Sequence, residues 1–171
     1  MGLAVLQRLN ATLLSLPDGA AGTRATLRLM AGLARQYRKT MPIRTLALDI
    51  VNRVPGHKNF AGEARALCLW VRDNIRYTRD VRDVETLQTP LKTLDIGQGD
   101  CDDQATLLSS LLESVGFKTR FLAIKTATLG PFVHVICEAF IVNDWVPLET
   151  TEPWEPGQFP IRVAGSMIEH V

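Results

Sequence analysis

Cysteine, net charge and uninterrupted apolar runs are all scarce in this sequence, and each scarcity excludes a class of protein. Three cysteines among 171 residues cannot all pair, so no disulfide framework is expected. Cys68 and Cys137 lie in apolar segments and are expected to be buried. No Cys-x-x-Cys or His-x-x-x-His spacing occurs, so a zinc site is not expected. A formal net charge of +1 creates no overall field that would attract nucleic acid.

The apolar stretch at residues 3–16 is interrupted by polar residues. Gln7, Arg8 and Asn10 stand inside it and no convincing small-residue cleavage site follows, so it predicts neither a signal peptide nor a membrane span. Leucines at helical spacing predict instead an amphipathic helix that ends at residues 17–19. The sequence therefore predicts a cytoplasmic protein with no membrane partner.

Hydrophobic periodicity predicts a series of helices followed by strands. We expect helices over about residues 23–39, 43–53, 61–74 and 101–116, an irregular stretch from 75 to 97, a strand over 119–126 and then a hairpin. The 46% hydrophobic content and the absence of repeats or a long Gly/Ser linker favour one compact domain. The predicted fold class is α+β, with residues 1–60 as an N-terminal helical extension that packs on a core and tail at residues 61–171.

Cys101 stands where a helix is expected to begin. Asp100 before it is a good N-cap, two glycines mark a turn, and leucines recur at helical spacing after it. The positive end of the helix favours a thiolate, the form of cysteine that attacks a carbonyl carbon. Asp100, Asp102 and Asp103 have the opposite effect on the Cys101 thiol, because their negative charges disfavour a second anion, the thiolate, beside them. An activated thiol here therefore needs a cationic partner.

The same three aspartates resemble part of a calcium loop. The residues that follow them are apolar and helical, and they lack the closing bidentate Glu of an EF-hand. Cys101 and His134 could supply two zinc ligands, but the spacing offers no others. We therefore expect no metal and no cofactor.

The cationic partner is sought in residues 132–151, which predict two antiparallel strands joined by a tight turn. His134 lies in the first strand and Glu149 in the second. If the turn is at 142–143, the two side chains share a face as diagonal neighbours about 7–8 Å apart between backbones. If the turn is at 143–144, the face is the same but the offset doubles, and contact would require a bulge.

Each candidate also has a plainer structural interpretation. Cys101 could be a buried cysteine at a helix start, His134 a core or surface histidine and Glu149 a solvated acid at a strand end. Asp144 is a rival partner for His134, although a residue at the tip of a turn is poorly placed to reach it. Tyr77 could donate its hydroxyl to a developing oxyanion, or it could be an amphipathic tyrosine at the edge of the core.

Five blocks of sequence, at the spacing of a compact domain, together cover roughly residues 61–155: 70–77, 88–94, 99–103, 134–135 and 145–151. In these blocks the chain resembles the transglutaminase-like superfamily of papain-like cysteine enzymes, in its bacterial and phage-encoded branch. The resemblance implies that Cys101 is the nucleophile, His134 the base and Glu149 the acid that orients it, with Tyr77 and Asp100 as oxyanion or substrate contacts. The family usually carries Asp at the third position, where this chain has Glu149.

The expected function is that of a cysteine-dependent amide hydrolase or acyl-transferase of the peptidase, amidase or transglutaminase-like kind. Its partner would be a peptide or protein amide substrate. The alternative is a non-catalytic transglutaminase-like binding or assembly module, related to phage. The sequence leaves the substrate, the acyl acceptor and the oligomeric state open.

Overall fold

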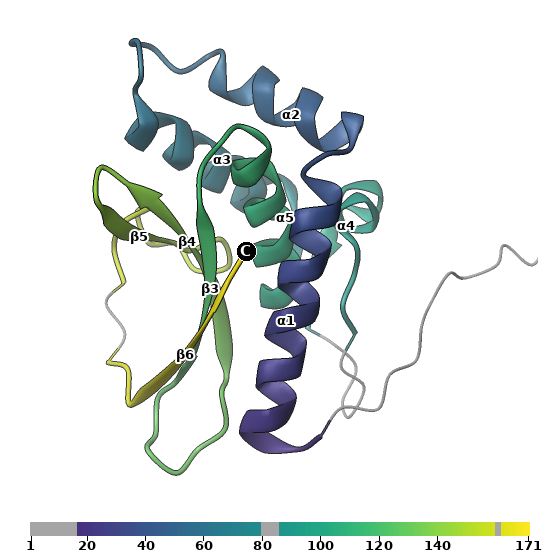
Figure 1. Ribbon diagram of the computed structural model, residues 1–171, viewed down its shortest axis with the longest axis vertical. Helices are drawn as coiled ribbons and strands as arrows, with labels where there is room; N and C mark the ends of the chain where they lie inside the picture. The colour runs from purple at the N-terminus through teal and green to yellow at the C-terminus, as the bar shows by residue number, and fades with distance from the viewer. Residues whose placement is uncertain (1–16, 80–85, 160–161) are drawn as a thin grey trace, which may run out of the picture.

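A computed structural model describes residues 17–79, 86–159 and 162–171 (Figure 1). Their helices and strands, in chain order, are α1 (Gly19–Tyr37), α2 (Met41–Val51), α3 (Phe60–Asn74), β1 (Arg76–Tyr77), α4 (Pro90–Ile96), β2 (Gln98–Gly99), α5 (Cys101–Ser114), β3 (Thr119–Lys125), β4 (His134–Ile141), β5 (Asp144–Leu148) and β6 (Gly165–His170). The helix expected over residues 3–16 lies outside the described residues. None of the helices over the described ranges combines the length and apolarity needed to cross a bilayer.

Four antiparallel strands form the main sheet, in the order β5-β4-β3-β6. The turn between β4 and β5 is Val142-Asn143, and both residues have positive φ, at 48° and 72°. Positive φ at both central residues is the signature of a type I′ turn, whose twist matches that of the flanking strands. This turn sets Cys137 opposite Leu148. The first of the two expected registers is therefore the one observed.

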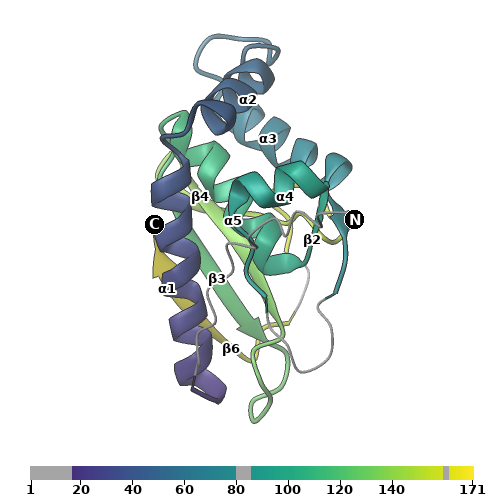
Figure 2. The same ribbon diagram turned by 90° about the vertical axis from the view of Figure 1, so that its right-hand side faces the viewer.

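Helix α5 lies at the centre of the structure and packs against the sheet as well as against α1, α2, α3 and α4. Figures 1 and 2 show α1 running alongside the sheet, with α2 and α3 toward one end of the molecule. Four leucines of α5 are fully buried, at positions 107, 108, 111 and 112. Because the helix is buried on several sides, its small polar residues are buried too, and Thr106 and Ser110 donate their hydroxyls to carbonyls one turn earlier.

Helices α1 and α2 share this core. Leu27 and Met30 of α1 and Ile43 and Ala47 of α2 belong to the same buried cluster as the leucines of α5. At the end of α1, Arg38 forms an ion pair with the buried carboxylate of Glu113 in α5. The N-terminal helices are thus an integral layer of the hydrophobic core.

The prediction of an irregular stretch from residue 75 to Gly97 is wrong, because α4 and two short parallel strands, β1 and β2, lie in or next to this stretch. Thr89 caps α4 by accepting from the Lys92 N–H, Pro90 occupies the first turn, and Gly97 ends the helix at φ 63°. The helix has 7 residues, which is too short to produce a clear hydrophobic period. Strand β6 was not expected either, because its residues pair with β3 residues that lie 40 to 50 positions away in the sequence.

Leu108→Ala and Leu111→Ala should each lower the free energy of unfolding by roughly 2–5 kcal/mol, because truncation leaves a cavity at a fully buried site. Leu129→Ala is the matched control, since Leu129 is fully exposed, and it should change the free energy by no more than about 0.5 kcal/mol. Urea unfolding followed by circular dichroism measures all three. Equal stability of the α5 variants and the control would contradict the central position of α5.

Candidate active site

Cys101 is the first residue of α5, and the residues around it explain why the helix begins there. The Asp100 carboxylate accepts a hydrogen bond from the Asp103 N–H at 3.1 Å, and the Asp103 carboxylate accepts one from the Asp100 N–H at 3.4 Å. This reciprocal pair is a capping box. A Cβ atom on Gly99 would lie 2.6 Å from the Asp103 Cβ, so glycine is needed before the cap. The helix start expected from sequence is confirmed.

The Cys101 thiol donates a hydrogen bond to the Asp102 carboxylate, with 3.4 Å between Sγ and Oδ1. Burial is the main cause that raises the pKa of this thiol, followed by the negative charge of Asp102, while the Val135 backbone N–H acts to lower it. The raised pKa keeps the sulfur protonated. Over the part of the chain that the structure describes, the thiol makes no hydrogen bond to His134. Burial and the neighbouring carboxylates thus outweigh the helix dipole.

His134 and Glu149 meet across the hairpin. The His134 Nε2 lies 2.5 Å from the Glu149 Oε2, and the two side chains are 16% and 1% exposed. The other carboxylate oxygen of Glu149 accepts from the Thr151 N–H at 2.6 Å and from the Thr151 hydroxyl at 2.8 Å. Burial by itself would raise the pKa of Glu149, but the hydrogen bond and charge of His134 and the two bonds from Thr151 together lower it below its usual value. Glu149 is therefore a buried carboxylate with partners on both oxygens.

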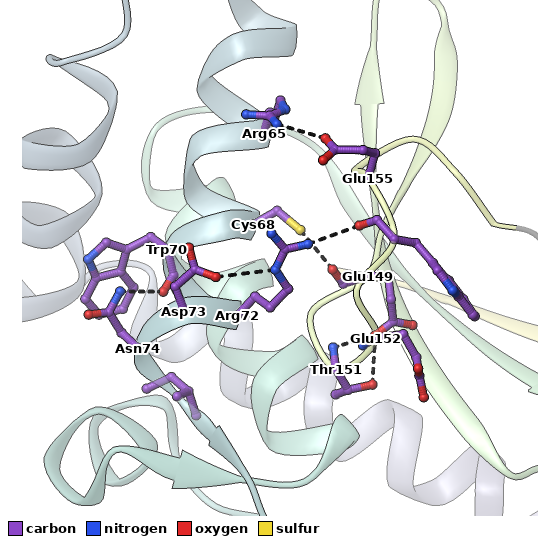
Figure 3. Close-up of polar contacts among 12 residues, drawn as sticks. Arg65, Cys68, Trp70, Arg72, Asp73, Asn74, Glu149, Thr151, Glu152 and Glu155 are labelled. Carbon is purple, nitrogen blue, oxygen red and sulfur yellow. Dashed lines mark hydrogen bonds and ion pairs between the residues drawn. The ribbon is translucent and has the colours of Figure 1, made fainter.

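Helix α3 supports the segment that carries Glu149 (Figure 3). The Cys68 thiol donates to the Glu149 carbonyl oxygen at 3.2 Å, and Arg72 donates to the Trp154 carbonyl oxygen at 3.1 Å. Burial raises the pKa of Cys68 to about 12, so it acts as a buried donor. Cys68 and Cys137 are both fully buried and free, as the sequence predicts.

Cys101 and His134 line the same pocket, a cavity of about 160 Å³. Asp100 and Asp102 contribute its acidic part. The remaining lining residues are Thr23, Thr26 and Leu27 from α1 and Phe132, Val133 and Val135 around the start of β4. The three α1 residues Thr23, Thr26 and Leu27 form one side of the pocket, the α1 wall. Sequence reasoning missed this wall, because no local signal relates a helix near residue 26 to a cysteine at position 101.

Tyr77 and Asp144 take different positions relative to this pocket. Tyr77 is 45% exposed and lies outside the set of lining residues, and burial is the main cause that raises the pKa of its hydroxyl. Asp144 is exposed at the turn and accepts from the Trp145 N–H. Glu149, rather than Asp144, is the carboxylate that contacts His134.

No group of three or more His, Cys, Asp or Glu side chains within residues 17–79, 86–159 and 162–171 is arranged to hold a metal ion. The site itself supplies a thiol, an imidazole with a carboxylate partner, and backbone N–H groups at a helix start. These groups are the parts required for nucleophilic catalysis by cysteine.

Comparison with known families identifies the fold. The family model of the transglutaminase-like superfamily matches residues 45–150. The chain belongs to this superfamily. The α+β fold with a papain-like, transglutaminase-like core is thereby confirmed, and a comparison with curated protein sequences found no relative.

Two solved structures have a similar fold. A proposed cysteine protease from Cytophaga hutchinsonii is 20% identical, with a TM-score of 0.54 over 67% of this chain and 38% of that one. A proposed protease from Parabacteroides distasonis ATCC 8503 is 14% identical, with a TM-score of 0.58 over 74% of this chain and 26% of that one. This chain therefore spans well under half the length of either of these two proteins. At these identities the likeness concerns the fold.

Asp102→Asn should make Cys101 more reactive toward iodoacetamide near neutral pH, because it removes a negative charge that raises the pKa of the thiol. The rate should rise by up to about tenfold for each unit by which the pKa falls. Alkylation rates measured across a pH series by mass spectrometry give both the rate and the pKa. Asp95→Asn, at an exposed carboxylate, is the control. An unchanged pH profile in Asp102→Asn would show that Asp102 does not restrain the thiol.

Asp103 should make stability depend on pH. Burial, and then the charge of Asp100, raise its pKa from 3.8 to about 7, so the folded chain binds this proton more tightly than the unfolded chain. The stabilisation of the folded chain by the Asp103 proton is fully present below about pH 4 and is lost as the pH rises through about 7. Relative to Asp103→Asn, which does not titrate, the wild type should lose free energy of unfolding between pH 4 and 7.

Urea unfolding at fixed pH values measures this difference, with Asp95→Asn as an exposed carboxylate control. A difference between the wild type and Asp103→Asn that stays constant or grows with rising pH would contradict the raised pKa of Asp103.

Proposed function

We propose that this protein is a cysteine-dependent amide hydrolase or acyl-transferase acting on a peptide or protein amide. Cys101 is the nucleophile, His134 the general base and acid, and Glu149 the residue that orients His134. One observation carries the proposal: His134 lines the pocket of Cys101 on one side and contacts a buried carboxylate on the other. An imidazole held by a buried carboxylate next to a cysteine is the arrangement that activates a thiol.

The contact with Glu149 assigns different tasks to the two ring nitrogens of His134. Because Nε2 is occupied by Glu149, Nδ1 is the nitrogen that takes the thiol proton. The sulfur then bonds to the substrate carbonyl carbon, and the carbonyl electron pair moves to its oxygen. When the tetrahedral species collapses, the carbon–nitrogen bond breaks and the leaving amine receives the proton from Nδ1. Water or a second amine releases the acyl group from the thioester by the same steps.

Charge on the carbonyl oxygen needs hydrogen-bond donors. The backbone N–H groups at the start of α5 lie beside the sulfur and point out of the helix, which suits them to this task. Tyr77 remains a proposed further donor only through the family resemblance, since it is 45% exposed and lies outside the residues that line the pocket. Asp100 contributes indirectly by capping α5 and so fixing the position of Cys101.

The hydrogen bond between Cys101 and Asp102 adds a step before catalysis. In the free protein the thiol is protonated and directed at Asp102, so it must turn toward Nδ1 before it can be deprotonated. We propose that substrate entering the pocket favours this rotation. The same protonated thiol favours the alternative function, a non-catalytic binding or assembly module, in which the rotation never occurs.

Turnover of peptide and glutamine amide substrates discriminates the two functions. Cys101→Ser should nearly abolish activity, and Glu149→Gln should lower kcat by roughly 10²–10⁴-fold because His134 loses its orientation. Glu149→Asp should retain part of the activity. Glu152→Gln, at a neighbouring exposed carboxylate, is the matched control and should behave like the wild type.

Ammonia or amine release measured by a coupled assay, with thermal melts of each variant, separates loss of chemistry from loss of fold. A folded wild type that releases no amine from any of these substrates would establish the binding module instead.

A further inference from the structure

Thr26 in α1 has an unusual environment for a buried helical hydroxyl. A serine or threonine inside a helix ordinarily donates its hydroxyl to the carbonyl one turn earlier. Thr23, Thr93, Thr106 and Ser110 all do so. Thr26 is only 6% exposed as a residue, and its hydroxyl makes no hydrogen bond within the described residues, but its oxygen keeps some accessible surface, because the buried unpartnered side-chain oxygens of those residues belong to Gln88 and Gln104. An accessible hydroxyl that is not bonded back to its own helix calls for a physical reason.

The position of Thr26 supplies that reason. Thr26 is one of the residues that line the pocket with Cys101 and His134. It comes from α1, which lies outside the segment matched by the family model at residues 45–150. The rest of the α1 wall is Leu27, which is apolar, and Thr23, whose hydroxyl is already bonded to the Gly19 carbonyl. Thr26 is therefore the hydroxyl of α1 that is available to a molecule in the pocket.

We propose that Thr26 is a substrate-binding residue whose hydroxyl hydrogen-bonds a peptide group of the amide substrate. This inference rests on the proposed function and adds the α1 wall to the substrate site. A peptide carries both an N–H and a C=O beside its scissile bond, and a hydroxyl can serve either one. The bond satisfies the Thr26 hydroxyl only when substrate is present, so its free energy contributes to binding rather than to folding.

The test uses two reagents that alkylate Cys101 by the same reaction. In each, the sulfur bonds to the carbon that carries chlorine, chloride leaves and the thiol proton passes to His134. Acetyl-Ala-Ala chloromethyl ketone carries two peptide groups that extend away from the reacting carbon, whereas chloroacetamide carries a single small amide next to it. The variants are Thr26→Val, which has the same shape without the hydroxyl, and Thr26→Ser, which retains the hydroxyl. Thr45→Val, at an exposed threonine in α2, is the matched control.

Thr26→Val should react roughly 3- to 10-fold more slowly than the wild type with the peptide reagent and at the wild-type rate with chloroacetamide. Thr26→Ser and Thr45→Val should resemble the wild type with both. The melting temperature of Thr26→Val should match that of the wild type, because the hydroxyl makes no hydrogen bond within the protein that the substitution would remove. A structural role for Thr26 would instead lower the melting temperature and slow both reagents.

Two other outcomes overturn the inference in distinguishable ways. If Thr26→Val reacts like the wild type with the peptide reagent while the wild type still prefers that reagent to chloroacetamide, Thr26 does not bind substrate and the proposed function stands. If the wild type shows no preference for the peptide reagent and releases no amine from peptide or glutamine substrates, the proposed function fails together with the inference.

Discussion

The arrangement of this molecule depends on the burial of one carboxylate. Glu149 is 1% exposed, and an ionised carboxylate removed from water costs several kcal/mol unless its oxygens are paired. His134 occupies one oxygen, and the backbone and hydroxyl of Thr151 occupy the other. These contacts require the β4–β5 register, the turn of the chain after β5 and the support of α3 through Cys68 to occur together. The carboxylate thereby fixes the histidine that faces the pocket.

Burial and two carboxylates set the resting state of the thiol. The capping box of Asp100 and Asp103 starts α5 and positions Cys101, while burial, and then the negative charges of Asp102 and Asp100, raise the pKa of the Cys101 thiol. Alkylation and oxidation of a cysteine need the thiolate, so a raised pKa slows both reactions at Cys101.

Local signals predicted what lies close in sequence. Asp100 and the leucine spacing were sufficient to place Cys101 at the start of α5, and strand alternation placed His134 and Glu149 on one face. The choice between the two turns was left open because a β-branched residue such as Val142 rarely adopts positive φ, and only the packed sheet decides the matter. Strand β6 and the α1 wall escaped prediction because both depend on contacts between distant segments.

The position of α1 and β6 has a consequence for how this chain can be divided. Both lie outside residues 45–150, yet α1 covers α5 and contacts β6, where Arg35 donates to the His170 carbonyl oxygen. A fragment cut to the family segment would uncover the apolar surface beneath Leu27 and Met30 and leave β3 as an unpaired sheet edge. We expect such a fragment to aggregate, because the hydrophobic core of the described residues extends beyond the family segment on both sides, from Leu27 to Met167.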